Sequence, residues 1–373
     1  MRQNYLIVKT QDECKRLFAS TSGQPITRVA FQGLDMPQEA FAHTYKNCLF
    51  LACRMPRGLK RQLTDSLVFP EMGELFTVQS ELYTASTLYA GYQPGNPRTF
   101  KDTYDQHVYQ HYLKRGKRST DIKETLARTL HDHSISMALH EFLSAYPPFD
   151  VVGVMGGHSI RRDDAQFATV AHISKRLTES GKLMISGGGP GAMEATHLGA
   201  WMAGRTDEEL AQAIRMLSTA PEYTHPMWLD TAMQVRLRWP QTRYESVGIP
   251  TWLYGHESAT PLATRIAKYF DNSIREDGIL TLAMGGIVFT PGSAGTLQEI
   301  FQEAVQDHYL SFGTSSPMIF LGVDFWTKEI PVYPLIQDLL ARGKYKNLIL
   351  GLSDDVESVV KQINDFRPAV AGQ

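Results

Sequence analysis

The chain has 373 residues, which is enough for one large or two medium domains with hydrophobic cores. Thirty-seven basic and 39 acidic side chains give a net charge of -2, which argues against non-specific binding to nucleic acid or to an anionic membrane. No apolar run approaches the roughly 20 residues of a membrane span, and the N-terminus lacks the apolar core of a signal peptide. The three cysteines, Cys14, Cys48 and Cys53, lack a zinc-like spacing and indicate reduced thiols. We therefore expect a cytoplasmic protein.

The first 145 residues differ in character from the rest of the chain. Residues Thr27–Gly33 and Asn47–Arg54 are expected to be strands, and residues Asp121–Ser144 a helix that leads into the second region. No internal repeat and no catalytic motif is evident. We therefore expect residues 1–145 to form an N-terminal α+β region, to which the sequence assigns no role.

Two histidines, His131 and His133, lie close together within this expected helix and raise the question of a metal site. Residues two apart on a helix point in different directions, so the pair does not share one face. We expect polar surface or interface positions for both. We expect no metal and no cofactor.

Residues 146–373 alternate between short β-rich runs and helical segments. The expected strands are Val151–Met155, Leu183–Ile185, Gly248–Tyr254, Gly286–Thr290, Met318–Val323 and Asn347–Leu350. The expected helices are Asp164–Ser180, Ala192–Met202, Ala259–Ile274, Thr296–Asp307, Pro334–Gly343 and Asp355–Phe366. This alternation predicts an α/β fold with a Rossmann-like, doubly wound parallel sheet. Sheets of this kind bind ligands beyond the carboxyl ends of their strands.

Two glycine-rich segments follow expected strands and open into expected helices. One is Gly187-Gly188-Gly189-Pro190-Gly191, and the other is Pro291-Gly292-Ser293-Ala294-Gly295-Thr296. A strand, glycine loop and helix in this order direct bare backbone N–H groups and a helix N-terminus at an anion, usually a phosphate. Two such loops on parallel strands of one sheet indicate a single ligand held from both sides.

Three motifs in this region carry a family resemblance. Gly156-Gly157-His158-Ser159 ends the first strand, GPGAMEA follows the second strand, and PGSAGTLQE follows a later one. The region resembles the LOG family, the cytokinin-activating nucleotide phosphoribohydrolases that are often mislabelled lysine decarboxylases. It is most similar to the longer bacterial pyrimidine/purine nucleotide 5'-monophosphate nucleosidases, over about residues 150–365. The resemblance implies a homo-oligomer, a dimer or higher, because related enzymes dimerise through helices beside the active site.

The family's motif is PGGxGTxxE, with an arginine upstream. The residues that match the motif are Pro291, Gly292, Gly295, Thr296 and Glu299. Arg275 lies one residue further from the motif than the usual spacing, and Glu257 matches a ligand-binding glutamate. In three departures, Ser293 replaces the second glycine, Ala294 takes the variable position, and Glu276 follows the arginine where plant-type members have lysine.

The resemblance implies two groups of site residues. The expected catalytic residues are Glu299 and Arg275. The expected substrate-binding residues are Gly156, Ser159, Gly187, Gly188, Gly189, Gly191, Met193, Glu194, Glu257, Pro291, Gly292, Ser293, Ala294, Gly295 and Thr296.

The chemistry follows from the residues themselves. Cleavage of the N-glycosidic bond of a nucleotide passes through an oxocarbenium-like centre, which needs a carboxylate to activate water or to steady the positive charge. It also needs a donor for the departing base and a fixed 5'-phosphate. Glu299 lies about one turn beyond Thr296, within reach of the loop's ligand, and Arg275 supplies a charged fork for phosphate or a ribose–carboxylate network. We expect a nucleoside 5'-monophosphate nucleosidase that yields free base and ribose 5-phosphate.

The sequence leaves three alternatives open. A non-catalytic nucleotide sensor would keep the phosphate loops, although the intact Glu299 and Arg275 favour the enzyme. Glu194 either contacts the ligand or caps its helix. Residues Gly204–Pro240, longer than a usual connection, form either a lid over the base or an oligomer contact.

Overall fold

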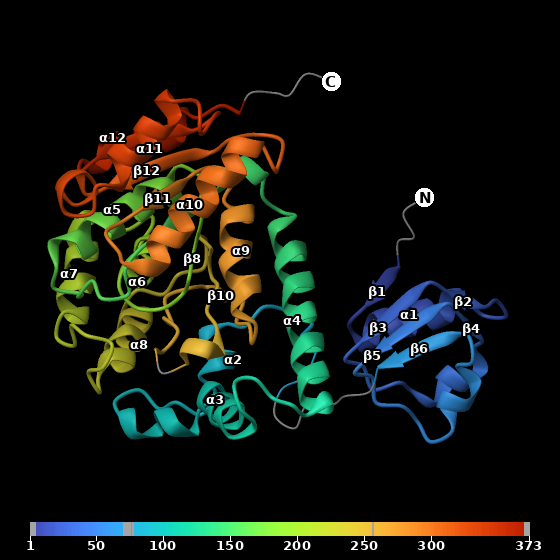
Figure 1. Ribbon diagram of the computed structural model, residues 1–373. Coiled ribbons are helices and arrows are strands. Elements are labelled where there is room, and N and C mark those ends of the chain that lie inside the picture. The colour runs from blue at the N-terminus through green and yellow to red at the C-terminus, as the bar shows by residue number, and fades with distance from the viewer. Residues whose placement is uncertain (1–4, 70–75, 77, 256, 369–373) are drawn as a thin grey trace. The chain divides into compact units, whose positions relative to one another are not determined.

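The chain divides into two compact units (Figure 1). The computed structural model describes residues 5–69, 76, 78–255 and 257–368. The first unit comprises Met1–Leu82 and Gln110–Glu141. The second, which we call the sheet unit, comprises Tyr83–Tyr109 and Phe142–Gln373. Among the described residues, no helix combines the length and apolarity needed to cross a bilayer.

The first unit is built on a parallel sheet of four strands in the order β1-β3-β5-β6, and strands β2 and β4 form a second parallel pair. Helix α1 (Gln11–Ser20) begins at a capping box of Thr10 and Glu13 and buries Cys14 and Phe18 in the core of this unit. The strands are β1 Leu6–Val8, β2 Ile26–Thr27, β3 Val29–Gln32, β4 Tyr45–Lys46, β5 Cys48–Leu51 and β6 Ser66–Phe69. Helices α3 (Tyr104–Arg115) and α4 (Ile122–Leu143) each have residues in both units.

The strands of the first unit are successive turns of an internal repeat. Residues of β3 pair with residues 19 positions further on in β5, and residues of β5 pair with residues 18 positions further on in β6. The rings of Phe31 and Phe50 stack with their centroids 4.9 Å apart, and the equivalent residues Arg28 and Asn47 both have positive φ. The expectation of no internal repeat is therefore wrong. Equivalent positions of the repeat share the type of side chain and the backbone conformation, but few of them have the same amino acid.

Helix α4 confirms the helix expected at Asp121–Ser144. His131 is buried, with its Nδ1 2.9 Å from Asp132 Oδ1, whereas His133 is exposed. The two side chains therefore point in different directions, and the surface or interface position expected for His131 is wrong because its side chain lies in the interior.

The sheet unit holds seven parallel strands in the order β10-β9-β8-β7-β11-β12-β13. All five residues of β7 are buried, as expected for a strand covered on both faces. The strands are β7 Val151–Met155, β8 Leu183–Ser186, β9 Ser246–Gly248, β10 Arg265–Ile266, β11 Ile287–Phe289, β12 Pro317–Leu321 and β13 Ile349–Ser353. This order confirms the Rossmann-like, doubly wound sheet.

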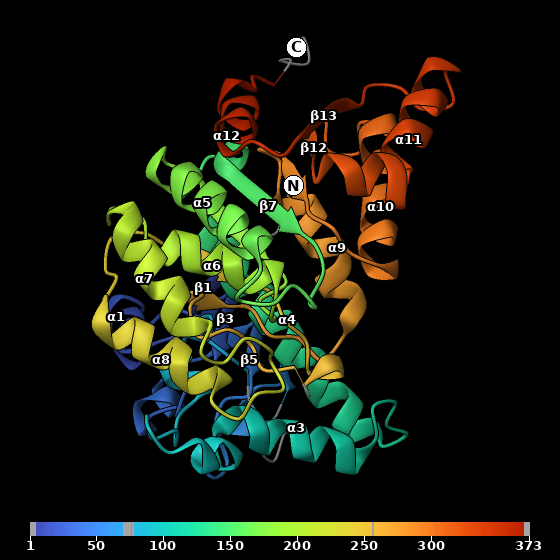
Figure 2. The ribbon, with the colours of Figure 1, turned by 90° about the vertical axis from the view of Figure 1, so that its left-hand side faces the viewer.

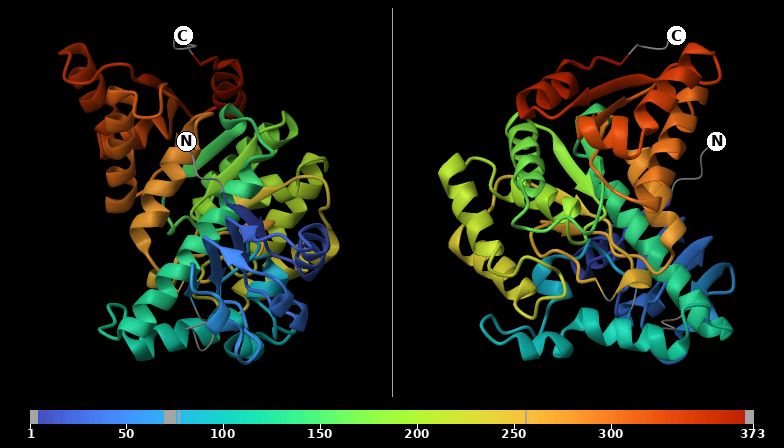
Figure 3. Two further views of the ribbon diagram at one scale, coloured as in Figure 1. Left: turned by 90° about the vertical axis from the view of Figure 1, so that its right-hand side faces the viewer. Right: turned by 60° about the vertical axis from the view of Figure 1, so that its left-hand side comes forward.

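Helices cover both faces of the sheet (Figure 2). Helices α5, α6 and α12 lie on one face and share a core cluster with β7 and β8, whereas α9 and α10 lie on the other face. Figure 3 shows the same layers from two further sides. The helices are α5 Ala165–Glu179, α6 Ala192–Trp201, α7 Asp207–Leu217, α8 Trp228–Arg238, α9 Asn272–Leu282, α10 Ala294–Tyr309, α11 Val332–Ala341 and α12 Val356–Asp365.

Two expectations for the sheet unit are wrong. The segment expected as a helix at Ala259–Ile274 contains the short edge strand β10, and helix α9 begins only at Asn272. A strand was expected at Gly248–Tyr254, but β9 already ends at Gly248. Residues Trp252–Tyr254 form a short 3-10 helix instead. The long connection Gly204–Pro240 contains α7 and α8.

Residues Tyr83–Tyr109, which include helix α2 (Ala85–Leu88), are held against the sheet by a buried ion pair. Lys268 Nζ lies 2.6 Å from Asp105 Oδ1, and both side chains are almost completely inaccessible to solvent. The Nε1–H of Trp252 donates to the same carboxylate oxygen at 3.0 Å. The carboxylate is therefore compensated by a cation and an indole donor.

Replacing Lys268 with Met leaves the Asp105 carboxylate buried without its cation, so we expect the sheet unit to lose about 3–5 kcal/mol of unfolding free energy. All five tryptophans lie in this unit, so tryptophan fluorescence during urea unfolding reports on it alone. The matched control is Lys328→Met, which breaks an exposed pair with Asp324 and should cost less than about 1 kcal/mol. Equal losses in the two variants would contradict the role given to the buried pair.

Candidate active site

Three glycine-containing loops meet at the carboxyl edge of the sheet unit. The first follows β7 at Gly156–Ser159, the second follows β8 at Gly187–Gly191, and the third follows β11 at Pro291–Gly295. Strands β8, β7 and β11 are neighbours, and the chain runs from β7 outwards to β10 on one side and from β11 outwards to β13 on the other. The loops therefore lie at the switch point of the sheet, where ligands bind in folds of this type.

The glycines let these loops approach one another closely. A Cβ on Gly156 would lie 1.7 Å from Thr290 Oγ1, and Gly191 has φ of +70° with no room for a Cβ beside the carbonyl of Gly157. The amide of Gly157 donates to Pro291 O at 3.0 Å, and the amide of Ala192 donates to Gly157 O at 3.1 Å. Backbone hydrogen bonds thus join all three loops into one rigid rim.

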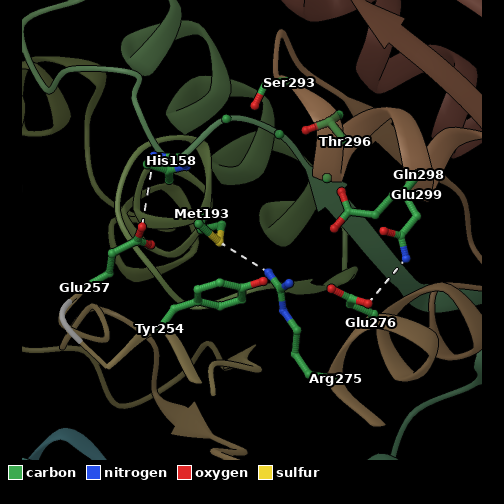
Figure 4. Close-up of a pocket in the computed structure, with 13 residues that line it drawn as sticks. His158, Met193, Tyr254, Glu257, Arg275, Glu276, Ser293, Thr296, Gln298 and Glu299 are labelled. Carbon is green, nitrogen blue, oxygen red and sulfur yellow. Dashed lines mark hydrogen bonds and ion pairs between the residues drawn. The ribbon is translucent and has the colours of Figure 1, made fainter. Parts of the chain in front are cut away.

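A pocket of about 240 Å³ opens between these loops and the start of α9 (Figure 4). Eight of the residues that line it were expected at the site: Gly156, Met193, Glu257, Arg275, Ser293, Gly295, Thr296 and Glu299. Five further residues also line it: Gly157, His158, Tyr254, Glu276 and Gln298. Helix α10 begins at this pocket, whose lining includes Ser293, Gly295 and Thr296, so the pocket has one helix N-terminus suited to an anion. Helix α6 contributes Met193 from its first turn.

Glu299 lies on α10 and is only 8% exposed. Burial raises its pKa from 4.5 to about 7, the nearby Arg275 guanidinium opposes this rise, and the Glu276 carboxylate adds to it. A carboxyl group with a pKa near 7 can exchange a proton with water or with a reacting group close to neutral pH.

Arg275 lies in the first turn of α9, and its side chain points into the pocket of its own chain (Figure 4). Its Nη2 lies 4.0 Å from Met193 Sδ, and a Cβ on Gly187 would lie 2.5 Å from the same nitrogen. The bare backbone of the Gly187–Gly191 loop therefore makes room for the guanidinium. The helix expected at Ala259–Ile274 would put Arg275 just beyond its C-terminal end. That layout is wrong because α9 begins at Asn272.

Further polar side chains complete the lining. Gln298 Nε2 donates to Glu276 Oε2 at 3.3 Å, and Glu276 also accepts a hydrogen bond from Asn272. On the opposite side, His158 Nε2 lies 4.0 Å from Glu257 Oε1. The ring of Tyr254 lies beside Arg275 at the mouth of the pocket (Figure 4). His158 and Gln298 lie within the GGHS and PGSAGTLQE motifs, whereas Tyr254 and Glu276 lie outside these motifs, and their place in the lining depends on the fold around β9 and α9.

The remaining expected residues are divided between the rim and a second pocket. Gly187, Gly188, Gly189, Pro291, Gly292 and Ala294 form the loops and do not line the first pocket. Ser159, Gly191 and Glu194 line a neighbouring pocket of about 350 Å³. The Glu194 carboxylate is fully buried and bonds to the Arg162 guanidinium, with Nε–Oε2 at 2.7 Å and Nη2–Oε1 at 2.5 Å. It therefore neither faces Glu299 nor caps α6 with its side chain.

Comparisons with known proteins identify only distant structural similarities. No protein-family model and no curated protein matches the chain. The X-ray structure of TM1055, a structural-genomics target, is similar to it with 20% identity and a TM-score of 0.38, covering 58% of this chain and 99% of that one. The molybdenum cofactor binding protein from the phototrophic bacterium Rippkaea orientalis is similar with 14% identity and a TM-score of 0.35, covering 57% and 94%. Likenesses of this size carry no functional argument, and the fold assignment rests on the strand order given above.

Proposed function

We propose that the protein is a nucleoside 5'-monophosphate nucleosidase that hydrolyses the N-glycosidic bond to free base and ribose 5-phosphate. The observation that carries the proposal is the meeting of the α10 N-terminus, a buried carboxyl with a pKa near 7 and an arginine in one pocket. The resemblance of GGHS, GPGAMEA and PGSAGTLQE to LOG-family motifs supports the same reaction.

In the proposed reaction, the loop Pro291–Gly295 and Thr296 at the start of α10 hold the 5'-phosphate through backbone N–H groups and a hydroxyl. The bond from the ribose carbon to the base nitrogen lengthens, and positive charge develops on the sugar. The Glu299 carboxylate steadies this charge and accepts a proton from the water that adds to the carbon. The departing base takes up a proton in turn, so the overall change is nucleotide plus water to base plus ribose 5-phosphate.

Arg275 has a positioning task in this scheme. Its guanidinium lies between the loop at Gly187 and the region of Glu299, and its charge favours the ionised form of that carboxyl. A planar, permanently charged fork can hold a ribose hydroxyl or a phosphate oxygen in register with the carboxylate. Loss of the fork should therefore impair the geometry of the reacting groups.

The direct test is incubation of the protein with a panel of nucleoside monophosphates and the matching nucleosides. We expect release of free base and ribose 5-phosphate from the monophosphates, and much lower kcat/KM for adenosine than for AMP, because both glycine loops favour an anion. Tight nucleotide binding without release of base would instead indicate a nucleotide sensor. Equal kcat/KM for AMP and adenosine would contradict the role of the loops.

Glu299→Gln should lower kcat by at least about a hundredfold and leave nucleotide binding within several-fold, because the amide cannot accept the proton. The measurements are steady-state release of base and calorimetric binding of AMP. The matched control is Glu303→Gln, which changes a second buried carboxyl on α10 that lies outside this pocket. Near-normal turnover in Glu299→Gln would rule out the catalytic assignment.

The same pair of variants gives a pH test. The folded-state pKa of Glu299 is about 7, so the carboxylate forms as pH rises through this value, and kcat/KM should rise with it. Glu303→Gln should keep this rising limb although burial raises the pKa of Glu303 to about 8. If Glu303→Gln lost the rising limb, the titrating group would be Glu303 and not Glu299, and the assignment would be wrong.

Arg275→Ala should reduce kcat/KM by about a hundredfold or more, because a charged group is lost from a desolvated ligand network. Adding Glu299→Gln should cost far less than the product of the two single effects, because the two residues act on the same step. The control is Arg342→Ala, because Arg342 forms an exposed ion pair with Asp338 of α11. Retention of more than a third of the activity in Arg275→Ala would make this arginine dispensable.

A further inference from the structure

The second pocket lies directly beside the first, and the side chain of His158 lines both. One wall is formed by the loop after β7 together with Pro190, and the other by residues Pro221–Trp228 from the connection between α7 and α8. Its lining combines apolar and aromatic residues, namely Ile160, Pro190, Pro221, Tyr223 and Trp228, with charged residues that pair with one another. The first pocket, by contrast, is lined mainly by charged and polar side chains.

The walls of the second pocket are held in place by buried polar contacts. Arg162 is fully buried and donates to Ala220 O and Trp228 O, each at 3.0 Å, as well as to Glu194. Arg161 forms a second, solvent-exposed ion pair with Glu222 across the same gap. The pocket is therefore built into the fold, and a ligand need not order its walls.

Tyr223 is the aromatic side chain that the pocket offers to a ligand. Trp228 is 2% exposed, and the Arg162 guanidinium covers its ring at 4.5 Å from the centroid. Tyr223 is half-buried, and its ring centroid lies 6.2 Å from that of His158 with the planes at 73°. A flat ring entering past His158 would meet the Tyr223 ring.

The sizes of the two pockets indicate how a nucleotide would be divided between them. Sites for small molecules usually enclose about 300–1,000 Å³, so the first pocket, at about 240 Å³, is small for a whole nucleotide. The α10 N-terminus and the carboxylates that line this pocket suit a sugar phosphate. The second pocket, at about 350 Å³, offers the Tyr223 ring and room for a two-ring base.

We propose that the second pocket is the nucleobase subsite, in which the base packs on Tyr223 and purines are held better than pyrimidines. This inference rests on the proposed function for the identity of the ligand. It assigns the connection Gly204–Pro240, through its segment Pro221–Trp228, to recognition of the base. A purine buries more of its surface against Tyr223 than a pyrimidine does, so the pocket selects by size and stacking.

The test measures binding in the Glu299→Gln background, so that it is independent of base release. The ligands are AMP, CMP and ribose 5-phosphate, and the method is calorimetry. We expect Tyr223→Ala to weaken AMP binding by about 10- to 100-fold, to narrow the preference for AMP over CMP, and to leave ribose 5-phosphate within about twofold. Tyr223→Phe, which keeps the ring, should bind AMP like the parent.

Three outcomes would overturn the inference. AMP binding unchanged by Tyr223→Ala would place the base elsewhere, and an AMP loss seen only in Tyr254→Ala would place it at the mouth of the first pocket. An equal loss of AMP and ribose 5-phosphate binding in Tyr223→Ala would show a general structural effect. Failure of the proposed function looks different: the wild-type protein would release no base while the dependence of AMP binding on Tyr223 persisted.

Discussion

The ion pair between Arg162 and Glu194 is the contact on which the geometry of the sheet unit's ligand edge depends. Two fully buried charges are costly to desolvate, and they are tolerated only when hydrogen bonds satisfy both partners. Here the guanidinium also donates to backbone carbonyls and to the Thr231 hydroxyl at 2.8 Å. One side chain thereby fixes three parts of the chain: the loop after β7, the start of α6 and the start of α8. The orientation of the α6 N-terminus and both walls of the second pocket follow from it.

The sequence predicted the centre of this unit well because its signals are local. The strand Val151–Met155 is found with the predicted bounds, and the glycine loops lie at the predicted edge. The helix predicted at Ala259–Ile274 failed for a tertiary reason. Its apolar residues resemble a helical stripe, but Leu262, Ala263 and Ala267 are all fully buried, and Ile266 pairs with Tyr83 in a β-bridge. A segment that is buried on all sides has no single apolar face, so its hydrophobic pattern does not distinguish a helix from a strand. The wrong helix bounds also gave the wrong place for Arg275.

Other features were beyond local reasoning. The repeat of the first unit is visible only when the strand register aligns residues 19 positions apart, because its successive turns share the type of side chain more often than the same amino acid. Glu276 and Gln298 come to the pocket from two helices, and their contact depends on how α9 packs against α10. The raised pKa of Glu299 likewise reflects enclosure and not sequence. Residue type and spacing identified Glu299 as a candidate, whereas its pKa depends on the surrounding fold.

The division into units has a consequence for how the protein is made and cut. The chain passes from one unit to the other after Leu82, after Tyr109 and after Glu141. The first unit therefore lacks its second segment until residue 141 has been synthesised, and it can start to fold only with part of its chain present. A protease that nicks any one of these crossings leaves the units joined through the other two. Removing residues 1–145 would also remove Asp105 and the rest of Tyr83–Tyr109, so a sheet unit produced in that way would lose the partner of Lys268 and part of its own packing.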